Sequence, residues 1–209
     1  MNNDYKNIIL ENISPTTGLL NSKAGCPVCS AIIDYEFDLL SKLQYEIHNN
    51  EIVRKEVAEE GGFCDFHFRQ FKKIASGLTN IAFLKSLIES SCYKKDNFKI
   101  ECRLCKQIGS YENSLISAQF ELLKEESFKK KFCNTIGLCF EHFRQVISIC
   151  DNEDIKNWLK EIHVEQIKRM RQDFENMLQY NSFYEIDREK RKLINIMIEK
   201  FAGRKTHAL

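Results

Sequence analysis

Hydrophobic residues recur at helical spacing along most of the chain. After Cys29, an apolar series predicts a helix that ends before His48; its members are Ile32, Ile33, Phe37, Leu40, Leu43 and Ile47. A second, shorter helix over residues 51–60 ends at Gly61-Gly62, a pair typical of a helix C-cap. The same order then returns, with helices predicted over residues 108–124 and 127–134 before Gly137.

The remaining segments also favour helices. Residues 1–25 are predicted to be a loose arm with one short helix near residues 5–12. A linker helix lies within residues 76–101, carried by Ile81, Leu84, Leu87 and Ile88 between residues 79 and 93. A long amphipathic helix is expected from Asp154 toward Gln179, and a last helix over residues 188–201. With only 8 Gly and 2 Pro in 209 residues, the chain has too few turn residues for an all-β fold, so the predicted class is all-α.

An internal repeat relates residues 26–75 to residues 102–150, at an offset of 76 that becomes 75 after one deletion. Cys26-Pro27-Val28-Cys29 aligns with Cys102-Arg103-Leu104-Cys105, and Tyr35-Glu36 aligns with Tyr111-Glu112. Further on, His67-Phe68-Arg69-Gln70 aligns with His142-Phe143-Arg144-Gln145. Each copy therefore reads C-x-x-C, a helical hairpin, then C-x-x-H. The predicted architecture is two such hairpins, with C-terminal helices from residues 151–203 packed on them in a single domain over residues 26–209.

Three thiolates and one imidazole in each repeat are a ligand set typical of structural zinc. The candidates are Cys26, Cys29, Cys64 and His67 for one ion, and Cys102, Cys105, Cys139 and His142 for the other. A first helix of about 18 residues travels about 27 Å, and a helix of about 10 residues plus about four extended residues returns a similar distance. C-x-x-H is therefore able to meet C-x-x-C of the same hairpin, although the sequence leaves open an exchange of motifs between the repeats.

Each ligand pair is expected to open a helix. Pro27 suits a first helical position, and Asp65 and Glu141 suit the first turn after each C-x-x-H motif. Arg69 and Arg144, two residues beyond each His, are candidates to compensate the formal −1 charge of a Cys₃His zinc site. The alternative is that these arginines match only because the repeat was duplicated and that they face water.

The nine cysteines argue for metal or thiol chemistry. No secretory signal and no stretch of eighteen apolar residues is present, which predicts a reducing, cytoplasmic location. An odd number of cysteines in C-x-x-C pairs then argues against a disulfide framework. Two zinc ions are the favoured cofactors, and an iron–sulfur cluster is the alternative. Cys92, Cys133 and Cys150 lie outside the motifs and are interpreted as small core residues, while His48, His163 and His207 are not expected to be ligands.

Charge and motifs narrow the function. Lys plus Arg number 31 and Asp plus Glu number 30, which gives a net charge of +1 and makes nucleic acid an unlikely partner. The favoured interpretation is a binding or scaffold module that meets another protein or a second copy of itself. The alternatives are a thiol redox protein or sensor that uses the C-x-x-C pairs, and a nucleic-acid-binding zinc protein. Neither a phosphate-binding loop nor a hydrolase motif is present, and with four protein ligands zinc has no open position, so the sequence leans away from an enzyme.

The motifs resemble a known family. C-P-x-C at Cys26, G-F-C-x-x-H-F at Gly62 and its copy G-L-C-x-x-H-F at Gly137, with a terminal Tyr-x-Ile-Asp-x-Glu stretch, resemble a bacterial family catalogued as domain of unknown function 6062. The resemblance runs from about Cys26 to Gly203. It implies paired Cys/His motifs on a mainly helical chain and brings no activity. The second C-x-x-C motif departs from the pattern, because Arg103 stands where the first motif has a proline.

Overall fold

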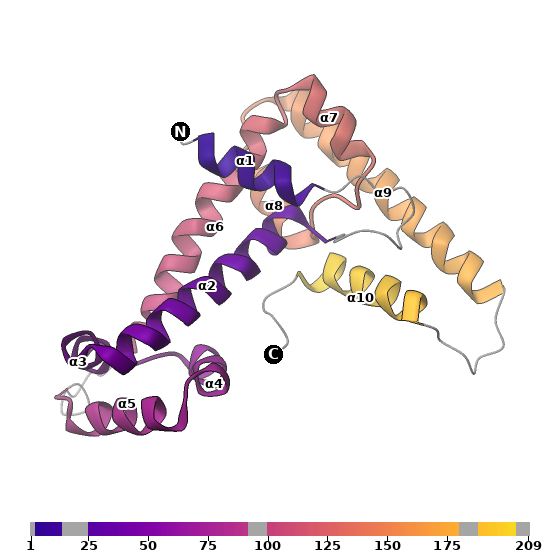
Figure 1. The fold of residues 1–209 in the computed structure, drawn as a ribbon. Coiled ribbons are helices and arrows are strands. Elements are labelled where there is room, and N and C mark those ends of the chain that lie inside the picture. Colours follow the sequence, from indigo (N-terminus) through magenta and orange to yellow (C-terminus); the bar gives the residue numbers. More distant parts are fainter. Residues whose placement is uncertain (1–2, 14–24, 92–99, 180–187, 204–209) are drawn as a thin grey trace. The chain divides into compact units, whose positions relative to one another are not determined.

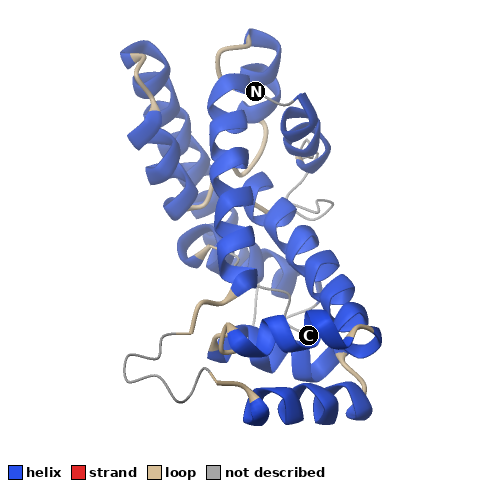
Figure 2. Cartoon of the chain, turned by 90° about the vertical axis from the view of Figure 1, so that its left-hand side faces the viewer, coloured by secondary structure: helices blue, strands red, loops and turns tan. Residues whose placement is uncertain are grey.

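The structure is a computed structural model, and it describes residues 3–13, 25–91, 100–179 and 188–203. All regular structure in these ranges is helical, which confirms the predicted all-α class for the described chain (Figures 1 and 2). In chain order the helices are α1 (Asn3–Asn12), α2 (Pro27–Asn49), α3 (Glu51–Glu59), α4 (Asp65–Ile74), α5 (Gly77–Glu89), α6 (Arg103–Leu122), α7 (Glu126–Cys133), α8 (Phe140–Ile149), α9 (Glu153–Gln179) and α10 (Arg188–Ala202).

The chain divides into two compact units. Unit 1 comprises the described residues of Met1–Ile32 and Glu112–Lys205, and unit 2 comprises those of Ile33–Tyr111. The boundary falls inside α2 and inside α6. Helices α9 and α10 belong to unit 1, whereas the prediction packs them across both hairpins as one domain. That single domain stays a prediction, and each unit is described by itself.

Unit 2 has an aromatic core. Asn50 caps α3 by accepting hydrogen bonds from the N–H groups of Ile52 and Val53, and Ser76 caps α5 in the same way. Gly61 and Gly62 end α3 with φ of 84° and 77°, a conformation that favours glycine. The turn brings Phe63 against three other rings, Phe68, Phe71 and Phe83, at centroid distances of 5.2 to 6.3 Å. Leu40, Leu43, Ile47 and Val57 complete this core.

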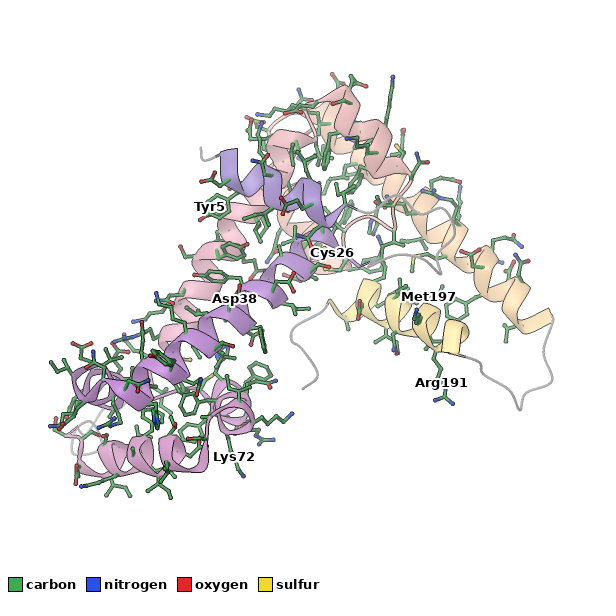
Figure 3. The ribbon with its side chains drawn as sticks, in the orientation of Figure 1. Tyr5, Cys26, Asp38, Lys72, Arg191 and Met197 are labelled. Carbon is green, nitrogen blue, oxygen red and sulfur yellow. The ribbon has the colours of Figure 1, made fainter. Side chains whose placement is uncertain are left out.

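Unit 1 packs its C-terminal helices against the second C-x-x-H segment. Met170 of α9 packs on Met197 of α10, which Figure 3 labels, and Phe140 of α8 stacks on Phe201. Gly137, with φ of 73°, turns the chain from α7 into α8 as predicted. The buried Lys200 of α10 donates 2.6 Å hydrogen bonds to the carbonyls of Ile136 and Leu138, on either side of that glycine. A helix that follows the second repeat thus fixes the approach to its C-x-x-H motif.

The predicted helices are confirmed to within a few residues, except that α2 and α6 are longer than expected. The predicted linker helix is present as α5, but most of the apolar residues that predicted it do not face the core. Leu87 is buried, but Ile81, Leu84 and Ile88 are exposed, because α5 turns Thr79, Phe83 and Ser86 inward against the core. Within the described residues, no helix is long and apolar enough to cross a bilayer.

Candidate metal centres

All four Cys motifs open helices. Cys64 and Cys139 are the N-cap residues of α4 and α8, and Cys26 and Cys102 directly precede α2 and α6. The second ligand of each motif lies three residues later, in the first turn. Since residues three apart share a face of a helix, both side chains of a motif point the same way. Free N–H groups at helix ends stabilise negative charge, and the N–H of His142 donates a hydrogen bond to Cys139 Sγ at 3.5 Å.

Unit 2 brings together Cys64, His67, Cys102 and Cys105, whose ligand atoms all lie within 4.8 Å of one another. The Nδ1 atom of His67 lies 3.2, 3.4 and 3.3 Å from the sulfurs of Cys64, Cys102 and Cys105, in that order. The Sγ atoms of Cys64 and Cys105 are 3.6 Å apart. Three sulfurs therefore surround one imidazole nitrogen.

Unit 1 repeats this arrangement with Cys26, Cys29, Cys139 and His142. The Nδ1 atom of His142 lies 3.3 Å from each of the three sulfurs. The Sγ atoms of Cys29 and Cys139 are 3.7 Å apart. Cys26 lies at the start of α2, where Figure 3 labels it.

The eight predicted residues thus gather into two tetrads, but the pairing within each repeat is wrong. Each C-x-x-C meets the C-x-x-H of the other repeat. The reason is the length of the helices. With 23 residues α2 rises about 35 Å, whereas the 9 residues of α3 return only about 14 Å. The returning C-x-x-H motif therefore lies level with Glu36, in the middle of α2, where the Glu36 carboxylate is 3.3 Å from His67.

Two glutamates outside the predicted ligand sets lie against the imidazoles. Glu36 Oε1 lies 3.3 Å from Nε2 of His67, and Glu112 Oε1 lies 3.1 Å from Nε2 of His142. The carboxylates face the ring nitrogen opposite the sulfurs, so they orient each imidazole with Nδ1 toward the tetrad. The sequence contains a sign of this role, because Tyr35-Glu36 aligns with Tyr111-Glu112 between the repeats. The two tyrosines stack at 4.0 Å, so the repeats meet at equivalent positions in unit 2.

The electrostatics of the tetrads favour a cation at their centre. Burial lowers the pKa of His67, but the sulfur of Cys102 and the carboxylate of Glu36 outweigh it and raise the pKa to about 10. The same balance raises the pKa of His142 to about 12. Hydrogen bonds from Cys26 and Cys29 hold the pKa of Cys139 far below its usual range. A cluster that binds a proton so strongly suits a divalent ion, which replaces that proton and the thiol protons together.

The arginines lie elsewhere. Arg69 pairs with Asp65 at 3.1 Å and Arg144 with Glu141 at 3.4 Å, both on their own helices and both largely exposed. The positive charge next to each tetrad comes instead from two helix N-termini, each equivalent to about half an elementary charge. In unit 1 the buried Lys200 adds to it, because its ammonium group interacts with the sulfurs of Cys26 and Cys139.

Four further cysteines and histidines lie in the described ranges, and none of them belongs to a tetrad. Cys150 is buried and donates toward the carbonyl of Asn152, whereas Cys133 is only half-buried. His48 pairs with Thr79 at 2.8 Å. His163 is buried against Phe140 and Phe143. Cys92 and His207 lie outside the described residues.

Comparison with known proteins adds no further constraint. No family model, no curated protein and no solved structure matches the chain. The likeness to domain of unknown function 6062 therefore stays a resemblance of motifs. What the molecule itself supports is a helical chain with two Cys₃His tetrads able to hold metal ions.

Proposed function

We propose that each tetrad binds one structural zinc ion. In a tetrahedral site with Zn–S near 2.3 Å and Zn–N near 2.1 Å, neighbouring sulfurs lie about 3.8 Å apart and sulfur and nitrogen about 3.6 Å. The sulfurs here are 3.6 and 3.7 Å apart, and the sulfur to Nδ1 distances are 3.2 to 3.4 Å. This match between ligand spacing and a single small ion is the observation that carries the proposal.

The same spacing disfavours an iron–sulfur cluster. In a [4Fe–4S] cluster each protein ligand binds a different iron atom, so the ligand atoms lie farther apart than around one ion. Two sulfurs separated by 3.6 Å leave no room for a cluster between them. Soft thiolates with one imidazole also favour zinc over magnesium or calcium, which prefer oxygen ligands.

The zinc ions have a structural role in this proposal. Four protein ligands leave no open position for water or substrate, so the metal has no site for hydrolysis. Each ion joins segments that lie far apart in the sequence, 110 residues between Cys29 and Cys139 and 41 between Cys64 and Cys105. A reducing cytoplasm keeps the eight ligands available as thiolates.

The biological role proposed for the chain is a binding or scaffold module. Support comes from α5, where Leu78, Ile81, Leu84 and Ile88 are 73%, 67%, 45% and 82% exposed. Their spacing of three, three and four residues places them along one side of the helix, while Phe83 and Leu87 face the core. An apolar row of this kind suits another polypeptide, either a different protein or a second copy of this chain.

Metal analysis tests the proposed binding of one zinc ion by each tetrad. Protein purified without added chelator is expected to contain two zinc ions per chain by plasma mass spectrometry. Removal with a strong chelator under reducing conditions is expected to lower helicity and the melting temperature, and zinc addition to restore both. Metal-free protein that keeps its fold, or a brown protein that contains iron and sulfide, would overturn the proposal.

Sedimentation velocity tests whether the exposed apolar row of α5 binds a second copy of the chain. If α5 mediates self-association, the double variant I81K/I88K is expected to shift the protein to monomer without loss of helicity. The variant Ile52→Lys is the matched control, because Ile52 is an equally exposed isoleucine on α3. A protein that is monomeric before substitution excludes the second copy and leaves a different protein as the partner. Equal effects of both variants would contradict a role specific to α5.

A further inference from the structure

The two tetrads have the same ligands and nearly the same spacing but differ in access. In unit 1 all four ligands are buried. In unit 2 Cys102 and His67 are buried, but Cys64 is half-buried and Cys105 is exposed. The repeat relation makes the comparison direct, because Cys105 is equivalent to Cys29 and Cys64 to Cys139. Those two equivalents are 2% and 0% exposed.

The cover over the unit 1 tetrad comes from a helix outside the repeats. Helix α10 packs on α8, and a Cβ built on Gly203 at its end would lie 3.7 Å from Cys139 Sγ. Lys200 of the same helix binds the carbonyl of Leu138, directly before that cysteine. Because α10 follows only the second repeat in the sequence, the duplication did not supply the first C-x-x-H motif with such a cover.

Exposed zinc thiolates are nucleophiles. Three thiolates and an imidazole give a zinc site with a formal charge of −1, which keeps electron density on sulfur, and reactivity then depends on access. Cys105 is the exposed cysteine of this tetrad, and Cys64 is a half-buried one whose sulfur lies 3.6 Å from the sulfur of Cys105. A disulfide bond of about 2.05 Å requires these sulfurs to approach by about 1.5 Å.

We propose that Cys105 and Cys64 form a peroxide-reactive site whose oxidation releases zinc from unit 2, while the equivalent pair in unit 1 stays reduced. The proposal rests on the zinc binding proposed above. A thiol sensor was the alternative function that the sequence left open. The proposal places that sensor in the unit 2 tetrad and leaves a structural role to the unit 1 tetrad.

The chemistry balances with hydrogen peroxide as the oxidant. The Cys105 thiolate attacks one oxygen, so an S–O bond forms, the O–O bond breaks, and the departing hydroxide takes a proton to become water. The product is a sulfenic acid. The Cys64 thiolate then attacks that sulfur, so an S–S bond forms, the S–O bond breaks, and the second hydroxide is protonated to water. Two thiolates lose two electrons in total, the peroxide gains them, and zinc departs because two of its four ligands are lost.

Zinc release from the full-length protein tests the proposal. Zinc content is measured first, so absent zinc identifies a failure of the proposed metal sites rather than of the reactive site. With two ions per chain, hydrogen peroxide is expected to release one ion at least about tenfold faster than the other, because buried thiols react only after local opening. Peptide mapping is expected to show a Cys64–Cys105 disulfide at that stage. Equal release rates, or early oxidation of Cys29 or Cys139, would overturn the proposal.

A matched pair of variants supplies the control. Replacement of one Cys by His leaves a Cys₂His₂ set, which still binds zinc. Cys105→His is expected to keep two zinc ions and to lose the fast phase, whereas Cys29→His is expected to retain it. Alkylation of the unmodified native protein gives an independent measurement if either variant fails to fold. Iodoacetamide is expected to label Cys105 before any other ligand, and equal labelling of Cys29 would contradict the inference.

Discussion

The exchange of motifs between the repeats makes a sharp prediction about pairs of substitutions. Cys29 and His142 belong to one tetrad, although 113 residues separate them, whereas His67 belongs to the other tetrad. With one zinc ion in each tetrad, as proposed, Cys29→Ser alone and His142→Ala alone are each expected to lower the zinc content from two ions to one. The double variant C29S/H142A is expected to retain one ion, because both changes affect the same site. The double variant C29S/H67A is expected to retain none.

The stability of these variants follows from the loops that the ions close. Chain entropy assigns about 5 kcal/mol to a cross-link between positions 110 residues apart and about 4 kcal/mol to one between positions 41 residues apart. Loss of the unit 1 ion is thus expected to lower the free energy of unfolding by about 5 kcal/mol, and a second substitution at the same site adds no further loss. The coupling energy between Cys29→Ser and His142→Ala is then of similar size. Cys29→Ser and His67→Ala act on separate sites, so their effects are expected to add within about 0.5 kcal/mol.

Native mass spectrometry counts the bound ions in the folded population, and urea unfolding at a buffered zinc concentration gives the energies. The pairing within each repeat, which the spacing of the motifs favours, predicts the reverse. Under that pairing C29S/H67A keeps one ion and C29S/H142A keeps none. That result would refute the exchange, and with it the explanation from the lengths of α2 and α3.

Three further predictions concern residues around the tetrads. Glu112→Gln is expected to weaken zinc binding in unit 1 by about 10- to 100-fold, because the carboxylate no longer orients His142. Competition with a chelator measures this affinity, and the surface variant Glu141→Gln should leave it unchanged. Burial and the nearby Lys200 lower the pKa of His163 to about 4, so the unfolded chain, with a pKa near 6.5, binds the proton first as the pH falls. The free energy of unfolding that this residue contributes is present above pH 6.5 and is lost toward pH 4, with a decrease of about 1.3 kcal/mol between pH 7.5 and 5.5. His163→Phe keeps the stack on Phe143 and should remove that pH-dependent decrease from urea unfolding curves. Gly137→Ala is expected to destabilise unit 1 by about 2 to 4 kcal/mol, because φ is 73° and the new Cβ would lie 1.9 Å from Oε1 of the buried Gln166. A Cβ added at Gly109 in α6 would have no atom within 4 Å, so Gly109→Ala should instead stabilise the fold by about 0.5 to 1 kcal/mol. A melting temperature that moves in the same direction in both variants would contradict this reasoning.

The local features of this protein follow from short stretches of its amino-acid sequence. The period of apolar residues located the helices, Gly61-Gly62 and Gly137 marked turns with positive φ, and the Cys motifs marked helix starts. These are properties of a few neighbouring residues, so the chain needs no partner to specify them. The eight ligand residues were also visible, because their chemistry and spacing survive in two copies.

Which C-x-x-C motif meets which C-x-x-H motif is a property of the folded chain. Two repeats with identical ligands satisfy the same coordination chemistry with either pairing, so composition and spacing do not distinguish them. The choice depends on how far α2 extends beyond the reach of α3, a difference of a few helical turns. The burial of the unit 1 tetrad likewise depends on α10, which begins 38 residues beyond the second repeat and reaches Cys139 only through packing in unit 1.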